Sequence, residues 1–132
     1  MLTLLDAARG ELVAAAASPS PAQRYAAAHL AALRAAAAVL AARAHPARTV
    51  RRGAPRTVWA LLAAVAPELS EWAAFFAAGA RKRAAAEAGL ARAVTPRDAD
   101  DLLRDAQVFL DLVTGTLGIP HQPVLSSDVT TG

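Results

Sequence analysis

Apolar residues recur every three or four positions along most of the chain, and prolines mark the places where this spacing restarts. The spacing predicts a first helix over residues 3–17, which ends before Ser18-Pro19. Ser20 is a suitable cap for a second helix beginning at Pro21, because the first position of a helix needs no N–H donor. We expect this second helix to reach Ala44, with an inward stripe formed by Tyr25, His29, Leu33, Ala36 and Leu40.

The middle of the chain holds most of the aromatic residues. A short helix is predicted over residues 57–66, and Pro67 then interrupts the pattern. A longer helix is predicted over residues 70–88, because the apolar spacing continues there until Gly89. We expect the core to be anchored by the aromatic residues of these two helices, which are Trp59, Trp72, Phe75 and Phe76.

The last predicted helix has the clearest start signal. Thr95 is a good capping residue, Pro96 suits the first helical position, and the carboxylate of Asp98 suits the positive end of the helix dipole. An apolar stripe then continues to Leu117, opposite an acidic face with Asp100, Asp101, Asp105 and Asp111. Residues 118–132 contain two prolines and no period, so we expect one domain over 1–117 and a disordered tail over 118–132.

Helical periods throughout, without a strand pattern or an internal repeat, predict an all-α fold. The expected architecture is an antiparallel bundle of four to five helices. Composition agrees, because more than a quarter of the 132 residues are Ala, the best helix former, whereas only 5% are aromatic. Alanine faces allow helices to approach closely but bury little area each. We therefore expect a homodimer that covers the remaining apolar surface.

The charge and the absence of Cys limit the function classes. The chain has a net charge of +3 at pH 7, which is ordinary for a small domain, and all but one of its 14 basic residues are Arg. Mean hydropathy is +0.31, yet charged residues interrupt the two most apolar stretches, 25–42 and 58–80. With no Cys and no secretory signal at the N-terminus, we expect a cytoplasmic protein without membrane association.

The residues that commonly hold cofactors are scattered. The three histidines are His29, His45 and His121, and no pair of them has the spacing of metal ligands. A glycine-rich phosphate loop is also missing, and the acidic run of the last helix is typical of a solvated helix face. We therefore expect neither a metal site nor a cofactor.

The strongest candidate for binding is a run of arginines between the second and third predicted helices. Five guanidinium groups fall within fourteen residues that contain no acid, and guanidinium groups pair bidentately with phosphate. This pattern indicates contact with RNA or a nucleotide, whereas an Arg-rich loop that pairs with acidic side chains of the same chain is the alternative. The candidate residues are Arg43, Arg48, Arg51, Arg52 and Arg56.

Several segments together resemble a known family. They are the helix from Arg24 to Leu40, Trp59-Ala-Leu-Leu, Pro67-Glu68-Leu69, Trp72-Ala-Ala-Phe-Phe, and the helix from Ala99 to Leu110. Over most of residues 3–115 the chain resembles an actinobacterial HEPN family of unknown function that is named after a Streptomyces protein. The resemblance implies a HEPN-type helical bundle, commonly dimeric, in a superfamily that includes RNA-cleaving toxins and many members without enzymatic activity.

The same resemblance makes Arg24 and His29 candidate catalytic residues. They form the pattern Arg-x4-His, which HEPN ribonucleases use as a catalytic motif. On one regular helix, however, five residues turn the side chains apart by about 140° and raise them by about 7.5 Å. The leading hypothesis is therefore a non-catalytic RNA- or nucleotide-binding module. The alternatives are a ribonuclease that uses Arg24 and His29, and a structural or regulatory module that binds another protein.

Overall fold

In the computed structural model, which describes residues 1–43, 57–90 and 92–119, every regular element is a helix. The α-helices are α1 (Leu2–Ala17), α2 (Pro21–Arg43), α4 (Val58–Val65), α5 (Ser70–Ala78), α6 (Ala80–Glu87) and α7 (Pro96–Thr116), and a short 3-10 helix, η1 (Pro67–Leu69), precedes α5. The all-α prediction is confirmed. The predicted arginine run, apart from Arg43, and residues 120–132 of the predicted tail lie outside the described residues.

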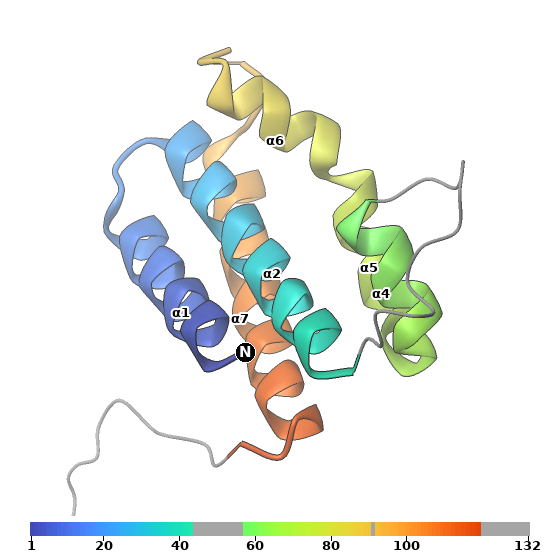
Figure 1. Ribbon diagram of the computed structural model, residues 1–132. Helices are drawn as coiled ribbons and strands as arrows, with labels where there is room; N and C mark the ends of the chain where they lie inside the picture. The colour runs from blue at the N-terminus through green and yellow to red at the C-terminus, as the bar shows by residue number, and fades with distance from the viewer. Residues whose placement is uncertain (44–56, 91, 120–132) are drawn as a thin grey trace, which may run out of the picture.

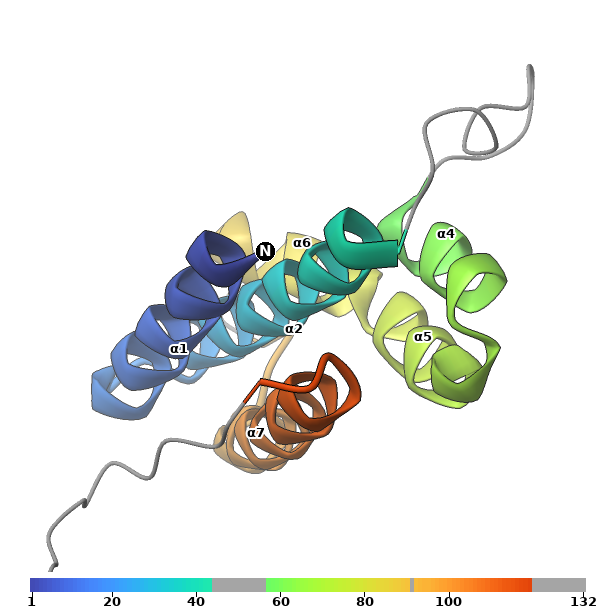
Figure 2. The same cartoon turned by 60° about the horizontal axis from the view of Figure 1, so that its bottom comes forward.

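Helix α2 is the centre of the bundle. It contacts α1, α7, α6 and α4, and Figure 1 shows α1, α2 and α7 lying side by side. Successive helices α1 and α2 run in opposite directions, whereas α7 returns alongside α2 in the same direction (Figure 1). The pair α4 and α5 packs at the carboxyl end of α2, away from α1 (Figure 2).

The composition of α2 follows from this central position. By length and composition alone, α2 could cross a membrane, but half of its most apolar window is buried inside the structure. A helix that is contacted by four other helices needs apolar residues on most of its faces. Small alanines meet this need and still allow the neighbouring helices to come close.

The predicted start signals are present as hydrogen bonds. The Ser20 hydroxyl accepts a hydrogen bond from the backbone N–H of Gln23 at 3.2 Å. At α7 the Thr95 hydroxyl accepts from the N–H of Asp98 at 3.0 Å, and the Asp98 carboxylate accepts from the N–H of Thr95 at 3.0 Å. This reciprocal capping box satisfies two donors that a helix start leaves unpaired.

Two glycines end helices by the same local geometry. Gly89 after α6 and Gly118 after α7 have backbone φ values of 80° and 72°, which residues other than glycine rarely adopt. In each case the N–H of the residue that follows the glycine donates back into the helix, from Leu90 to the carbonyl of Ala85 and from Ile119 to that of Thr114. Gly118 and Ile119, which the sequence pattern assigns to the tail, thus cap α7.

The helix predicted over residues 70–88 is divided at Gly79. In a continuous helix the carbonyl of Phe76 would accept from the N–H of residue 80. Here it accepts from the side chain of His29 at 2.8 Å and from the N–H of Gly79 at 3.0 Å. A Cβ atom at Gly79 would lie 3.0 Å from the hydroxyl of Tyr25, so the missing side chain lets α2 approach the break.

Two groups of side chains in the one hydrophobic core differ in size. The aromatic cluster consists of Trp59, Trp72, Phe76 and Phe109, whose ring centroids lie 5.1–6.4 Å apart. The alanine interface is formed by the buried alanines of α1, α2 and α7, which are Ala8, Ala15, Ala28, Ala31, Ala32, Ala35, Ala36, Ala38, Ala99 and Ala106.

Candidate nucleic-acid interface

Arg43, the last residue of α2, is the one member of the predicted arginine run that the structure describes. Its guanidinium lies 2.6 Å from a carboxylate oxygen of Glu68 in η1 and joins the carboxyl end of α2 to the turn before α5. The pKa of Glu68 is lowered by a hydrogen bond from its own backbone N–H and by the hydrogen bond from Arg43. Arg43 therefore already has an anionic partner, with which a phosphate would have to compete.

The charge of the chain is distributed unevenly. The described residues contain ten Arg or Lys side chains and ten Asp or Glu side chains, so this part of the chain is neutral. The four further arginines of the predicted run and Asp128 of the predicted tail account for the net charge of +3. All of the positive excess therefore belongs to the segment between α2 and α4.

Within the described residues, the basic side chains are largely neutralised by contact. Carboxylates lie within 4 Å of eight of the ten, and the distances range from 2.6 to 3.7 Å. The two without such a partner in this part of the chain are Arg81 and Arg92. The helical body thus offers little unpaired positive charge to a phosphate.

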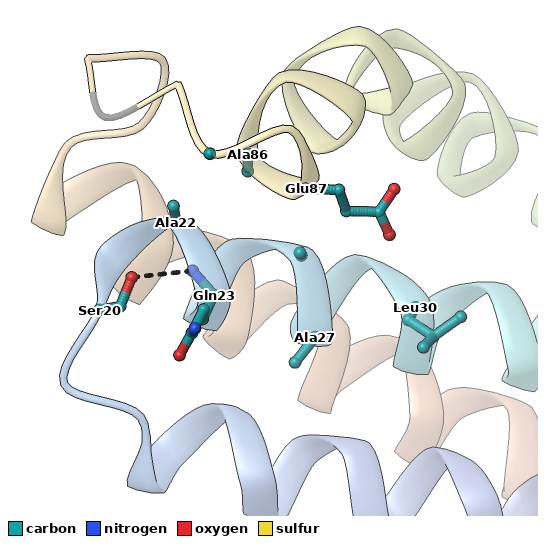
Figure 3. Close-up of a pocket in the computed structure, with 9 residues that line it drawn as sticks. Ser20, Ala22, Gln23, Ala27, Leu30, Ala86 and Glu87 are labelled. Carbon is teal, nitrogen blue, oxygen red and sulfur yellow. Dashed lines mark hydrogen bonds between the residues drawn. The ribbon is translucent and has the colours of Figure 1, made fainter.

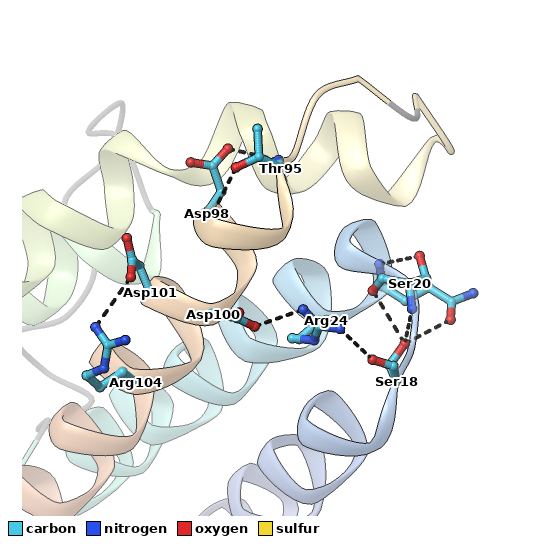
Figure 4. Close-up of polar contacts among 9 residues, drawn as sticks. Ser18, Ser20, Arg24, Thr95, Asp98, Asp100, Asp101 and Arg104 are labelled. Atoms are coloured by element: carbon cyan, nitrogen blue, oxygen red, sulfur yellow. Dashed lines mark hydrogen bonds and ion pairs between the residues drawn. The ribbon is translucent and has the colours of Figure 1, made fainter.

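Arg24, one of the two residues in the Arg-x4-His pattern, is occupied by contacts within the bundle. Figure 4 shows it between Ser18 and Asp100. Its guanidinium donates to the Asp100 carboxylate at 2.8 Å and to the backbone carbonyl of Ser18 at 2.9 Å. Arg24 therefore connects the start of α2 to the start of α7 and to the turn after α1.

His29, the other residue of the pattern, lies in the core with 1% of its surface exposed. Its Nε2 donates to the carbonyl of Phe76 at 2.8 Å, and the rings of Trp59 and Phe76 meet it edge-on. Burial is the largest cause that lowers its pKa, and the positive charge of Arg83 adds to it, whereas the Phe76 carbonyl and Glu87 act in the opposite direction. Its Nδ1 is buried and has no partner among the described residues, so the neutral imidazole is favoured.

These positions keep Arg24 and His29 apart. Both side chains belong to α2, but the guanidinium of Arg24 faces α7, whereas the imidazole of His29 faces the break between α5 and α6. A buried ring that already donates its proton to a carbonyl cannot reach a substrate in this arrangement. The site that a ribonuclease of this pattern would need is not assembled within the described part of one chain.

A groove of about 510 Å³ lies between the first half of α2 and the end of α6. Figure 3 shows Ala22, Ala27 and Leu30 of α2 opposite Ala86 and Glu87 of α6. The charged residue in its lining is the carboxylate of Glu87, which Arg83 holds at 3.0 Å. The lining is mostly small and apolar, with Ser20 and Gln23 as its neutral polar side chains and no basic residue, so the groove does not suit a phosphate.

Metal ligands do not gather in the described part of the chain, where no group of three or more His, Asp or Glu side chains could hold an ion. Sequence reasoning missed the partner of Arg43, because Glu68 is 25 positions away and belongs to another element. The nearest signal in the sequence is that Glu68 follows Pro67 at a turn, where a carboxylate is free to face the preceding helix.

Residues 15–114, about three quarters of the chain, match the protein family described as SAV_6107-like HEPN. No curated protein and no solved structure matches the chain.

Proposed function

The chain belongs to the SAV_6107-like HEPN family, and from this membership we propose that it is a non-catalytic module that binds RNA or a nucleotide through the segment between α2 and α4. The phosphate-contacting residues of the proposal are Arg43, Arg48, Arg51, Arg52 and Arg56. The observation that carries it is the charge distribution, since the described helices are neutral and the positive excess lies in this one segment.

Chemistry supports phosphate as the recognised group. Guanidinium groups stay charged at all physiological pH values and match two phosphate oxygens at once. Four arginines have no neighbouring acid in the sequence, so their pairing with a polyanion is more favourable in free energy than that of the helix arginines, which already have partners. No aromatic residue falls among residues 43–56, so the proposal is for phosphate contact rather than for base stacking.

The placement of Arg24 and His29 supports binding without cleavage. Arg24 is held by Asp100 and Ser18, and His29 is buried and hydrogen-bonded to Phe76. A ribonuclease would need at least one of these groups at a surface that RNA reaches. The sequence pattern is therefore better explained as two packing residues of α2.

We propose further that the protein is a homodimer. The exposed large apolar side chains include Val13, Val108 and Leu112, and the alanine interface buries little area per residue. Sedimentation of the purified chain at several concentrations measures this directly. A sedimentation coefficient that stays at the monomer value at every concentration would contradict the proposed dimer.

A salt-titrated binding experiment tests the main proposal. A labelled single-stranded RNA is titrated with the protein at increasing salt, and the logarithm of the affinity is plotted against the logarithm of the salt concentration. Each phosphate contact contributes about 0.7 to the slope for a single strand. We expect a steep slope for the native chain, and a slope smaller by about 1.4 for the double variant Arg48→Ala, Arg51→Ala.

A control with the same charge change separates a specific site from general attraction. Arg81→Ala combined with Arg92→Ala also removes two positive charges, and both residues lack a carboxylate partner in the described part of the chain. We expect this control to keep the slope of the native chain. Absence of binding at low salt, or equal losses in the two double variants, would overturn the proposal.

The ribonuclease alternative is tested with the same preparation. Intact RNA after prolonged incubation agrees with a binding module. Cleavage that the variant His29→Gln abolishes would show instead that the chain is a ribonuclease. A mononucleotide offered in place of RNA distinguishes the two ligand sources, since it presents fewer phosphates and gives a smaller salt slope.

A further inference from the structure

A second pocket, unrelated to the arginine segment, lies between α5 and α7. Its lining consists of Glu71, Trp72 and Phe75 from α5 and Asp105 from α7, and its volume is about 340 Å³. This volume is near the lower limit of small-ligand pockets. The pocket combines two aromatic rings with two carboxylates.

The two rings form a rigid corner. Trp72 and Phe75 are perpendicular to each other, with centroids 6.3 Å apart. Trp72 stacks on Phe76 at 5.9 Å, and Phe75 meets the edge of Phe76 at 5.0 Å, so both walls rest on the aromatic cluster. Phe75 is nevertheless 45% exposed, which makes it the most exposed aromatic side chain of the protein. An exposed ring on a rigid support offers a face to a ligand.

The two carboxylates lack the partners that other acids in the protein have. Seven of the ten described acidic side chains pair with Arg or Lys, and the remaining three are Glu71, Asp105 and Asp111. Two of these three meet at the pocket. Burial raises the pKa of Asp105, and the negative charge of Asp101 adds to this effect while Arg104 opposes it. A cation in the pocket would relieve this unfavourable environment.

The combination of groups selects the class of ligand. Carboxylates repel phosphates and acidic groups, and aromatic faces attract cations through their negative π surface. Two carboxylates provide at most about four of the roughly six to eight oxygen ligands that a calcium ion takes, and the two rings provide none. A guanidinium group fits both features, because its plane stacks on a ring while its N–H fork pairs with a carboxylate.

We propose that this pocket binds an arginine side chain presented by a partner polypeptide. The guanidinium stacks against the ring corner formed by Trp72 and Phe75, and it pairs with Glu71 and Asp105. The alkyl stem of the arginine covers the exposed face of Phe75. The proposal is independent of RNA binding, because it uses acidic residues on α5 and α7 rather than the basic segment.

The test uses a capped Ala-Arg-Ala tripeptide as the probe and the full chain as the receptor. Binding is followed by NMR through the indole N–H signals of Trp72 and Trp59. A single side chain gives a weak complex, with a Kd of about 1 to 10 mM. We expect the Trp72 signal to move and the Trp59 signal to stay, since Trp59 is buried away from the pocket.

Matched probes and variants make the test specific. The citrulline tripeptide has the shape of the arginine tripeptide without its charge, and we expect no shift with it. The double variant Glu71→Gln, Asp105→Asn weakens the affinity for the arginine probe about tenfold. Phe75→Leu keeps an apolar side chain but removes the ring, and weakens it about two- to fivefold. Asp111→Asn is the control, because Asp111 is the third acid without a basic partner among the described residues and does not line the pocket.

Several results would overturn the proposal. They are equal binding of the citrulline probe, unchanged affinity in the Glu71→Gln, Asp105→Asn variant, and an equal loss in the Asp111→Asn control. Tighter binding of spermidine than of the arginine probe would also overturn it, because the ligand would then be a free polyamine. The RNA titration does not depend on the residues that line this pocket. A negative result with the arginine probe is therefore distinguishable from a failure of the proposed RNA binding.

Discussion

The alanine interface and the aromatic cluster belong to one core but differ in the size of their buried side chains. Half of the buried residues of α1, α2 and α7 are alanines, whereas aromatic rings from α4, α5 and α7 pack against one another. A buried aromatic side chain removes about 150–250 Å² of surface from water, several times what a methyl group removes. Stabilisation is therefore concentrated in the rings, while the alanines determine how closely the helices approach.

The substitution with the largest expected effect is Phe76→Ala in the aromatic cluster. Phe76 is fully buried and stacks on Trp59 and Trp72 at 5.2 and 5.9 Å. We expect the free energy of unfolding, measured by urea denaturation, to fall by about 3–5 kcal/mol. Phe75→Ala is the control, because the neighbouring ring is half-exposed and its loss leaves no closed cavity. Equal losses in the two variants would contradict the concentration of stability at Phe76.

The next largest effect is expected when a small side chain of the alanine interface is replaced by a larger one. Ala35 is fully buried in α2, so Ala35→Leu forces a larger side chain into a close helix contact. We expect a loss of about 1–3 kcal/mol in the free energy of unfolding. Ala41→Leu, on the exposed end of the same helix, should change it by less than about 0.5 kcal/mol. If Ala35→Leu stabilises the protein, the interface contains unfilled space and the comparison fails.

His29 lies where α2 meets the aromatic cluster, and it makes the stability of this contact dependent on pH. Its pKa is lowered in the folded protein, mainly by burial, from an ordinary value near 6.5. As the pH falls below that value, the unfolded chain binds a proton that the folded chain excludes, so the free energy of unfolding decreases. The slope from one such proton is at most about 1.4 kcal/mol per pH unit.

The measurement compares the native chain with His29→Gln between about pH 7.5 and about pH 5. The amide of Gln can still donate to the carbonyl of Phe76 but does not titrate. We expect the native chain to lose stability faster than the variant as the pH falls. Parallel curves for the two proteins would mean that the imidazole becomes protonated without cost in the core.

The limits of sequence reasoning follow from the same two regions. Helix starts at Pro21 and Pro96 were predictable, because capping and proline effects act over a few neighbouring residues. The break at Gly79 was not, since it depends on Tyr25 and His29 approaching from another helix. Within the predicted helix 70–88, Gly79 is one small residue in an apolar period and gives no sign of these contacts.

The candidate sites show the same division. The excess of arginine between α2 and α4 can be read from the sequence alone, because charge is a local property of composition. Arg43 pairs with Glu68, which lies 25 positions further along the chain. Asp105 lines a pocket with the rings of α5, which lie about 30 positions before it, and sequence periodicity does not reveal contacts at such separations. The sequence predicts a solvated acidic face on α7; Asp100 and Asp111 are exposed, and Asp98, Asp100 and Asp101 also have basic partners that the sequence does not indicate.

The smallest expected effect concerns the ion pair that joins α2 and α7, two of the three helices of the alanine interface, at their starts. Arg24 of α2 and Asp100 of α7 lie 2.8 Å apart, and the carboxylate is largely exposed. An exposed pair of this kind contributes about 0.2–1 kcal/mol, because water and salt screen it. Asp100→Asn removes the charge but leaves the bond from Arg24 to the Ser18 carbonyl intact.

We expect this variant to lower the free energy of unfolding by less than about 1 kcal/mol at low salt, and by less still at high salt. Asp111→Asn, which removes an equal charge from α7 where no basic partner lies within the described residues, is the control. A loss as large as that of Ala35→Leu, unchanged by salt, would show that the start of α7 is held by this contact rather than by the close fit of its alanines.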